Sequence, residues 1–440
     1  MLRALAIPLL LANSAVAQEF FTLKGHGGPI MAITVSDADQ IATASFDNSV
    51  GFWEGAVPHW RDGHRAAVNA VTFGPDGQLI SGGDDNTVRF WPTGGAGVIM
   101  GTHQAKITDV AWSQSAELIA SSSWDHTIGL WQLKADAGPA PFPPPKDPGR
   151  FLKGHRKGVN DIAFTQDGSQ LYSASVDGTI KHWDVSDGEF LRGVVDHGFG
   201  INTLILNEDA GWIAYGGQDG ATRIVDIESG TQIADFTLDR RPVLAMSFDV
   251  NSGQLAVGDG QGYIMIIDTQ AMKITRDFRA TRNGPIWALA FSKNGENLHA
   301  GGVEDIVYSW PVATMDAHGR MSGTPRSFLE NPQGLPNGER QFKRKCSVCH
   351  TVTNGSARKA GPSLYQVFGR KAGSVTDYSY SDTLNGSEIV WSAETINALF
   401  DLGPDHFIPG TKMPMQRIVE QSDRDDLIEY LRSATAQEGD

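Results

Sequence analysis

The stretch KGHRKGVNDIAFTQDGSQLYSASVDGTIKHWD, residues 153–184, determines the fold of the larger part of the 440-residue chain. Its first segment, VNDIAF, alternates apolar with small or polar residues, as a half-buried β-strand does. The turn sequence TQDG, a second strand, the turn sequence VDGT and a third strand that ends near a tryptophan follow. This order predicts a small sheet of short antiparallel strands.

The same pattern occurs seven times along the chain. Its first strands begin at residues 30, 68, 107, 159, 201, 243 and 286. Five of the third strands end near a tryptophan, namely Trp53, Trp91, Trp131, Trp183 and Trp310. Four short strands in about 40 residues form one blade of a propeller, so we predict an all-β, seven-bladed propeller over residues 18–313.

Residues 153–184 resemble a WD40 repeat, with its Gly-His and Trp-Asp dipeptides at both ends. The resemblance implies a hydrogen-bonded chain through His155, Ser173, Asp177 and Trp183. The second and third repeats carry similar sets, His64, Asp85 and Trp91 in one and His103, Asp125 and Trp131 in the other. The fifth and sixth repeats depart from the family pattern, since Val225 and Ile267 replace the tryptophan.

Two further segments belong to this propeller. EFFTL, residues 19–23, precedes the first Gly-His dipeptide, and a propeller must close, so we expect it to supply the outer strand of the last blade. DAGPAPFPPPKDPG, residues 136–149, explains the long third interval, and we expect a stiff surface loop there. Hydrogen bonding within the blades accounts for the repeated histidines, so we expect no catalytic site among them.

The N-terminal sequence MLRALAIPLLLANSAVAQEF has an arginine, an apolar run and a small-x-small cleavage pattern. This arrangement predicts a signal peptide over residues 1–17 and export to the periplasm. The alternative is a buried N-terminal strand or helix. No other segment approaches the length of a membrane span, so we expect no membrane insertion.

Both cysteines lie in KRKCSVCHTV, residues 343–352, with His350 directly after the second. Three chemistries fit this spacing: a redox-active thiol pair, half of a zinc site, and covalent attachment of haem. A C-x-x-C-H motif presents two thiols to the vinyl groups of haem and an imidazole to the iron. A redox pair is typical of a βαβ context, and a zinc site needs two more close ligands.

Residues 335–440 follow a linker over residues 314–334 and resemble mitochondrial cytochrome c and bacterial cytochrome c2, which are all-α class I c-type cytochromes. FIPGTKMPM, residues 407–415, is similar to the haem-ligand loop of that family. The resemblance implies one haem c, bound covalently through Cys346 and Cys349, with His350 and Met413 as the iron ligands. Met415 is expected to pack nearby.

Other parts of this domain extend the resemblance. GPSLYQVFGRKAG, residues 361–373, is similar to the loop under the haem, which implies that Pro362 lies against His350 and Arg370 near a propionate. Tyr380 and Trp391 match the residues that hydrogen-bond the propionates. The family usually has a tyrosine where this chain has Leu399. We expect a first helix that ends at the cysteines, and a terminal helix over residues 422–434 capped by Ser422, with Leu427, Ile428 and Leu431 on one face.

These implied ligands occupy both axial positions of the iron, which favours single-electron transfer over catalysis. The propeller is then expected to be a docking or assembly platform for redox partners. Two alternatives remain: a haem-containing oxidoreductase with an additional site in the propeller, and an interaction protein whose haem senses the redox state.

Net charge is distributed unequally between the two domains. The net charge is −15, yet residues 335–440 hold 12 Lys and Arg against 14 Asp and Glu. We expect a redox partner to dock at a basic face, made of Lys343, Arg344, Lys345, Lys371 and Lys412, or on the propeller. An alternative is that the acidic propeller is the docking surface for its own cytochrome. Acidity and export argue against nucleic acid as a partner.

Overall fold

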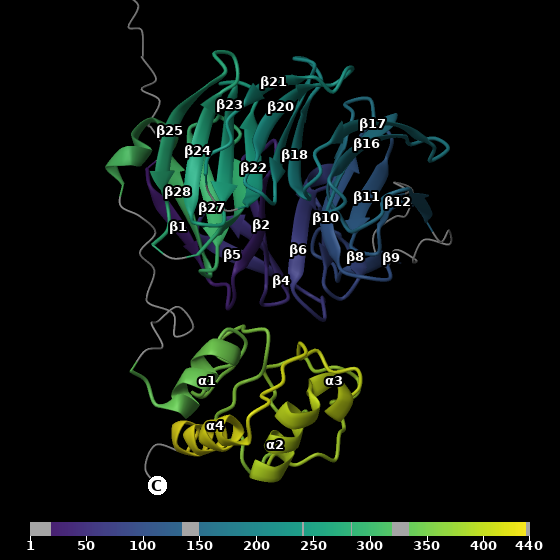
Figure 1. Cartoon of the computed structure of the whole chain (residues 1–440). Helices are drawn as coiled ribbons and strands as arrows, with labels where there is room; N and C mark the ends of the chain where they lie inside the picture. Colours follow the sequence, from purple (N-terminus) through teal and green to yellow (C-terminus); the bar gives the residue numbers. More distant parts are fainter. Residues whose placement is uncertain (1–18, 134–148, 240–241, 283, 319–333, 437–440) are drawn as a thin grey trace, which may run out of the picture.

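The computed structural model describes residues 19–133, 149–239, 242–282, 284–318 and 334–436 (Figure 1). The predicted signal peptide, nearly all of the proline-rich loop and most of the predicted linker lie outside these ranges. Figure 1 shows a propeller with a smaller helical domain lying against one of its faces. Within the described ranges, no helix is both long enough and apolar enough to cross a membrane.

The propeller consists of seven four-stranded antiparallel sheets. Blade one has β2 (Ile30–Val35), β3 (Ile41–Ser45), β4 (Ser49–Glu54) and β5 (Val57–Asp62), and blade two has β6 (Val68–Phe73), β7 (Leu79–Gly83), β8 (Thr87–Trp91) and β9 (Val98–Thr102). Blade three has β10 (Ile107–Ser113), β11 (Leu118–Ser123), β12 (Thr127–Gln132) and β13 (Arg150–Lys153), and blade four has β14 (Val159–Phe164), β15 (Gln170–Ser175), β16 (Thr179–Asp184) and β17 (Phe190–Asp196).

The remaining blades follow the same plan. Blade five has β18 (Ile201–Asn207), β19 (Trp212–Gly217), β20 (Thr222–Asp226) and β21 (Gln232–Asp235), and blade six has β22 (Val243–Asp249), β23 (Gln254–Asp259), β24 (Tyr263–Asp268) and β25 (Lys273–Arg279). Blade seven has β26 (Ile286–Phe291), β27 (Asn297–Gly302), β28 (Ile306–Pro311) and β1 (Phe21–Lys24). The first strand of each blade begins at the residue that the repeat predicts, so the seven-bladed fold is confirmed.

The ring closes between its two ends. β1 pairs antiparallel with β28, with Phe21 opposite Ser309 and Lys24 opposite Ile306. The prediction for residues 19–23 is therefore confirmed. A short 3-10 helix, Val312–Ala317, follows β28, and its Met315 is fully buried in the core of the last blade.

A polar chain ties the strands together in each of the first four blades. In blade four, His155 Nδ1 lies 3.0 Å from Asp177 Oδ2 and its Nε2 lies 2.7 Å from Ser173 Oγ, to which Trp183 Nε1 donates over 2.8 Å. Blades two and three repeat this arrangement, as predicted. Blade one also has it, with Thr43 in place of the serine, which the sequence reasoning missed.

Blades five and six form their four-stranded sheets without the complete polar chain of hydrogen bonds. In blade six, Ile267 stands where other blades have tryptophan, pairs opposite Leu255 and is completely buried. Blade five keeps His197, which lies 3.0 Å from Asp219, while Val225 fills the tryptophan position. Alternating strands and apolar packing are therefore sufficient for a blade, and the polar chain is an addition to them.

Four helices form the smaller domain: α1 (Asn337–Lys345), α2 (Ala393–Leu402), α3 (Pro404–Phe407) and α4 (Gln421–Ala434). α1 and α4 cross closely, because a Cβ on Gly338 would lie 2.0 Å from the carbonyl oxygen of Asp426. The α4 residues Leu427, Ile428 and Leu431 are buried, as predicted. The Ser422 cap is wrong, because the helix begins earlier, with the Arg424 N–H donating to the Glu420 carbonyl.

Candidate cofactor site

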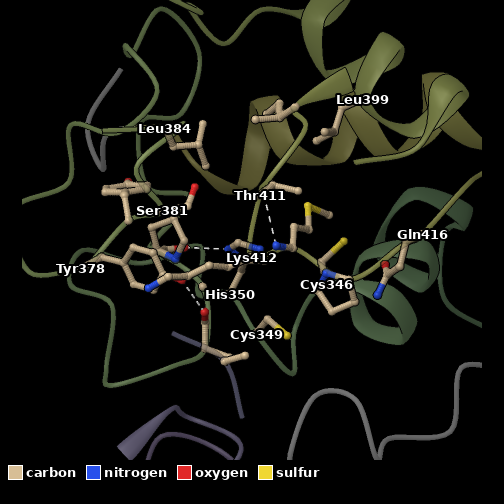
Figure 2. Close-up of a pocket in the computed structure, with 18 of the residues that line it drawn as sticks. Cys346, Cys349, His350, Tyr378, Ser381, Leu384, Leu399, Thr411, Lys412 and Gln416 are labelled. Carbon is tan, nitrogen blue, oxygen red and sulfur yellow. Dashed lines mark hydrogen bonds between the residues drawn. The ribbon is translucent and has the colours of Figure 1, made fainter. Parts of the chain in front are cut away.

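Both cysteines line a cavity of about 600 Å³, whose wall comes mainly from the helical domain and partly from the propeller turns that face it (Figure 2). α1 ends at Lys345, and one further turn follows: the Cys349 and His350 N–H groups donate to the Cys346 carbonyl over 3.0 and 2.9 Å. This turn is the local structure that the C-x-x-C-H spacing predicts. It brings the two thiols and the imidazole to one cavity.

Burial determines the state of the two thiols. It raises the pKa of Cys346 to about 12 and that of Cys349 to about 11, so both remain protonated at neutral pH. A protonated thiol is a poor nucleophile, which argues against a redox-active pair. Both cysteines are free rather than joined in a disulfide.

The imidazole of His350 is held in one orientation. Its Nδ1 lies 2.7 Å from the carbonyl oxygen of Pro362, and a carbonyl only accepts, so Nδ1 carries the proton. Burial lowers the pKa of His350 and favours the neutral ring, which leaves the Nε2 lone pair for a metal. Gly361 makes room for the ring, because a Cβ there would lie 2.4 Å from His350 Cε1.

Met413 lines the same cavity and packs against the domain core. Its N–H donates to Thr411 Oγ1 over 3.2 Å, which anchors the loop beside it. Met415 is 51% exposed, and a Cβ on Gly403 would lie 2.6 Å from its sulfur, so it packs on the outside of the same loop. Leu399 is buried in the cavity wall at the position where the sequence comparison expects tyrosine.

Polar residues lie among the apolar ones in the cavity wall. Arg370 donates from Nη1 to the Tyr365 carbonyl over 2.6 Å and from Nη2 to the Ser363 carbonyl over 2.7 Å, so its guanidinium is fixed within its own loop. Tyr380 and Trp391 also line the cavity, both half-buried. The Tyr380 hydroxyl accepts a long hydrogen bond of 3.4 Å from the Val375 N–H.

Ser381 is a site residue that the sequence reasoning did not single out. Its hydroxyl is buried in the cavity wall and has no hydrogen-bond partner among the described residues. A buried hydroxyl without a partner is costly, so it fits a polar group of a bound molecule. The signal was present in YSYSDT, where it follows Tyr380 directly.

These donors suit haem c better than a single metal ion. Figure 2 shows Leu384 and Leu399 across the cavity from Cys349, and the wall as a whole is mainly apolar. Two thiols can form the thioether links, while one imidazole and one thioether sulfur can bind iron. Zinc needs four close ligands and little space, whereas this cavity has room for a large planar group.

Comparisons with known proteins agree with both parts of this description. The family described as "WD domain, G-beta repeat" matches residues 17–54, 58–92, 98–132 and 146–184. The family described as "Cytochrome c" matches residues 335–435. Repeats five to seven fall outside the first match, and two of them also depart from the tryptophan pattern.

Individual relatives match the helical domain over nearly their whole length. The cytochrome c of Ginkgo biloba is 42% identical over 113 residues, which are 26% of this chain and 99% of that protein. The cytochrome c of Theileria annulata is 44% identical over 113 residues, covering 26% of this chain and 96% of the relative. That of Sesamum indicum is 42% identical, with 25% and 99% covered.

Proposed function

Because the chain belongs to the cytochrome c family through residues 335–435 and carries WD40 repeats in its propeller, we propose that it transfers single electrons through one haem c held by Cys346 and Cys349. One observation carries this proposal: both thiols, the His350 imidazole and Met413 line a single apolar cavity. When bound, the haem supplies one-electron redox chemistry at a potential that His/Met ligation raises.

The chain's own residues have distinct roles in this proposal. His350 would bind the iron through Nε2, because its Nδ1–H donates a hydrogen bond to the Pro362 carbonyl and leaves Nε2 unprotonated. Met413, which lines the same cavity, would hold the iron through its sulfur. Arg370, Tyr380 and Trp391 line the cavity and would contact the propionates, and the unpartnered Ser381 hydroxyl would add a fourth polar contact.

The propeller is proposed to be the docking platform for redox partners, with residues 18–313 forming that domain, 314–334 the linker and 335–440 the cytochrome. The basic face is partly neutralised, because Lys343 pairs with Glu339 and Lys371 pairs with Glu388. Arg344, Lys345 and Lys412 are then the main candidates for a partner's acidic groups. Lys345 and Lys412 also line the cavity.

Location is part of the proposal. Residues 1–17 would be removed on export to the periplasm, where haem is attached to C-x-x-C-H motifs. Mass spectrometry of the protein purified from periplasm tests this directly, since the expected mature N-terminus is Gln18. A full-length chain retained in the cytoplasm would contradict it.

Production of the full chain in cells that attach c-type haem tests the main proposal. The denatured protein should keep the mass of one haem, and equilibrium titration should show a single one-electron transition. A chain that acquires no haem under these conditions, or that acquires one and undergoes no reversible one-electron reduction, would contradict the proposed function.

A further inference from the structure

The turn after the repeat histidine makes the same hydrogen bond in blades one to four, from the N–H of the next residue to the aspartate of that blade. In blades one and two the residue after the histidine is Gly27 or Arg65, and its N–H donates to the blade's aspartate, Asp47 or Asp85, over 2.8 or 2.9 Å. Each turn is therefore fixed by the polar chain of its own blade. These two turns lie on the face of the propeller that meets the cytochrome (Figure 1).

Gly27 allows the cytochrome to approach unusually closely. A Cβ at Gly27 would lie 2.3 Å from both the carbonyl carbon and the carbonyl oxygen of Arg358, and 2.4 Å from the carbonyl oxygen of Ala357. All three nearest atoms belong to the cytochrome. The approaching turn is itself unusual, since Ala357 and Arg358 have φ values of 48° and 52°. The absence of a side chain at Gly27 is thus what the contact requires.

The Arg358 side chain extends this contact along blade one. Its Nη2 donates to Asp62 Oδ1 over 2.5 Å, and its guanidinium lies over the Trp60 ring at 4.3 Å from the ring centre. Ion-pair and cation–π contacts of this kind are favourable but modest where they are exposed to solvent.

Blade two meets the edge of the cofactor cavity. Arg65 Nη1 donates to Asp382 Oδ2 over 3.2 Å, and Asp382 directly follows Ser381. Arg65, Ala66 and Asp85 line the same cavity as Cys349 and His350. Part of the cavity wall is therefore supplied by the propeller rather than by the cytochrome.

We propose that the Gly27 and Arg65 turns form an internal docking surface that covers the edge of the haem cavity, and that a protein redox partner reaches this edge only when the contact opens. The inference rests on the proposed function, because it assumes haem in the cavity. Exposure makes opening feasible: the Arg65 and Asp382 side chains are 62% and 83% exposed, so salt and water weaken their pair.

The propeller provides its own matched control. Gln104 in blade three occupies the position of Gly27, and its N–H makes the same bond to Asp125. It is exposed rather than packed against the cytochrome. Gly27→Leu places a side chain in the contact, whereas Gln104→Leu places the same side chain on the uncovered part of the rim. A charge-reversed pair, Asp62→Lys with Arg358→Glu, tests the ion pair separately from Arg358→Glu alone.

The experiment compares these full-length haem-loaded chains by X-ray scattering and by haem reduction. Reduced flavin mononucleotide serves as a small electron donor, and the same flavin bound in flavodoxin serves as a protein donor. For Gly27→Leu at low salt we expect a larger radius of gyration and at least fivefold faster reduction by flavodoxin, with less than twofold change for free flavin. Gln104→Leu should match the wild type, and the charge-reversed pair should restore what Arg358→Glu loses.

Two results would overturn the inference. The first is an unchanged radius for Gly27→Leu and for Arg358→Glu, which would mean that the contact is not formed in solution. The second is a larger radius with unchanged reduction by flavodoxin, which would mean that the contact leaves the haem edge accessible. Failure of haem attachment contradicts the proposed function instead, and it is recognised from the mass of the denatured protein before any radius or rate is compared.

Discussion

The propeller repeats one structural unit, the four-stranded blade, seven times, whereas the cytochrome has a single core around its cofactor cavity. Four blades repeat the chain from histidine through serine or threonine to tryptophan, and blade six closes without it. The core of the cytochrome instead includes Cys346 and, packed against it, Met413, both of which are cofactor donors in our proposal. The cavity of about 600 Å³ lies among these same residues.

This difference indicates which substitutions should lower the stability of each domain most. A blade that loses one polar contact keeps its strands, its apolar packing and its two neighbouring blades. A domain whose core surrounds a large cavity depends on the group that fills it, because unfilled volume costs stability. Substitutions of similar size should therefore have unequal effects in the two halves of the chain.

Removal of both thiols should have the largest effect. We expect the Cys346→Ala/Cys349→Ala chain to retain no haem after denaturation and to lose the cooperative unfolding of the helical domain, while the propeller unfolds at an unchanged temperature. Calorimetry of the full chain measures both transitions. An unchanged helical transition in the variant would show that the cofactor does not organise this core.

The second-largest effect should distinguish the two methionines of the haem-ligand loop. Met413→Ala removes the proposed axial sulfur, so the midpoint potential should fall by on the order of 0.1 V or more, within the ~0.8 V that axial ligands span. Met415→Ala is the matched control, since this side chain is 51% exposed and lies outside the cavity wall. Equal potentials for the two variants would remove Met413 from the ligand set.

A smaller loss is expected when one blade's polar chain is broken. His155→Leu leaves the Asp177 carboxylate without its imidazole partner and Ser173 without one of its two side-chain partners. Burial raises the pKa of Asp177, but hydrogen bonds, first that from His155, hold it below its usual value. We expect a cost of about 2–3 kcal/mol at neutral pH with the propeller still closed.

Denaturant unfolding of the propeller measures this cost, and the contribution of the His155–Asp177 contact should disappear as the pH falls. The reason is that a lowered carboxyl pKa stabilises the fold above the unfolded value of 3.8 and ceases to do so in acid. Loss of the whole propeller in this variant would mean that one blade's chain is indispensable.

The smallest effect concerns two facing carboxyls, Asp109 in β10 and Asp161 in β14. Burial raises the pKa of both carboxyls, and the neighbouring Asp161 raises that of Asp109 further. The two groups share a hydrogen bond. The folded state then holds an extra proton, so the pair costs stability as the pH rises above 3.8. Asp109→Asn should be more stable than the wild type by about 1 kcal/mol at pH 7 and equal to it near pH 3.

Asparagine is chosen because its amide can donate to Asp161 in place of the shared proton. The free energy of unfolding, measured by denaturant titration at several pH values, tests this prediction, with the exposed Asp209→Asn as the control. A variant that is less stable than the wild type at pH 7 would show that the pair is not held together by a proton.

Sequence alone predicted the features that repeat or that depend on local spacing. Each first strand began where alternation placed it, from Ile30 to Ile286, and Phe21–Lys24 closed the ring as expected. The turn at Cys346–His350 followed from its motif. The start of α4 was wrong because helix ends depend on backbone bonds, here between Arg424 and Glu420, as much as on capping residues.

Contacts between distant segments could not be predicted in this way. The Ser381 hydroxyl is conspicuous only when its burial is known, since serine is common in exposed loops. Arg65 lies 317 residues before Asp382, and no periodicity connects a propeller turn to a cytochrome loop. The cluster of lysines and arginines near the two cysteines made the acidic propeller a candidate docking surface for its own cytochrome, but it did not indicate which turns meet.

Closure of the ring by β1 and β28 also imposes an order in time. Phe21 pairs with Ser309, so the first strand must wait for nearly the whole propeller to be synthesised, roughly 15 to 60 s at ~5–20 residues per second. During that interval the nascent chain has blades with open edges, which invite pairing with other chains. Blade one, whose Gly27 turn meets the cytochrome, also packs through β2 against β26 of blade seven, so the first blade in the sequence gains one of its two neighbours only from the last.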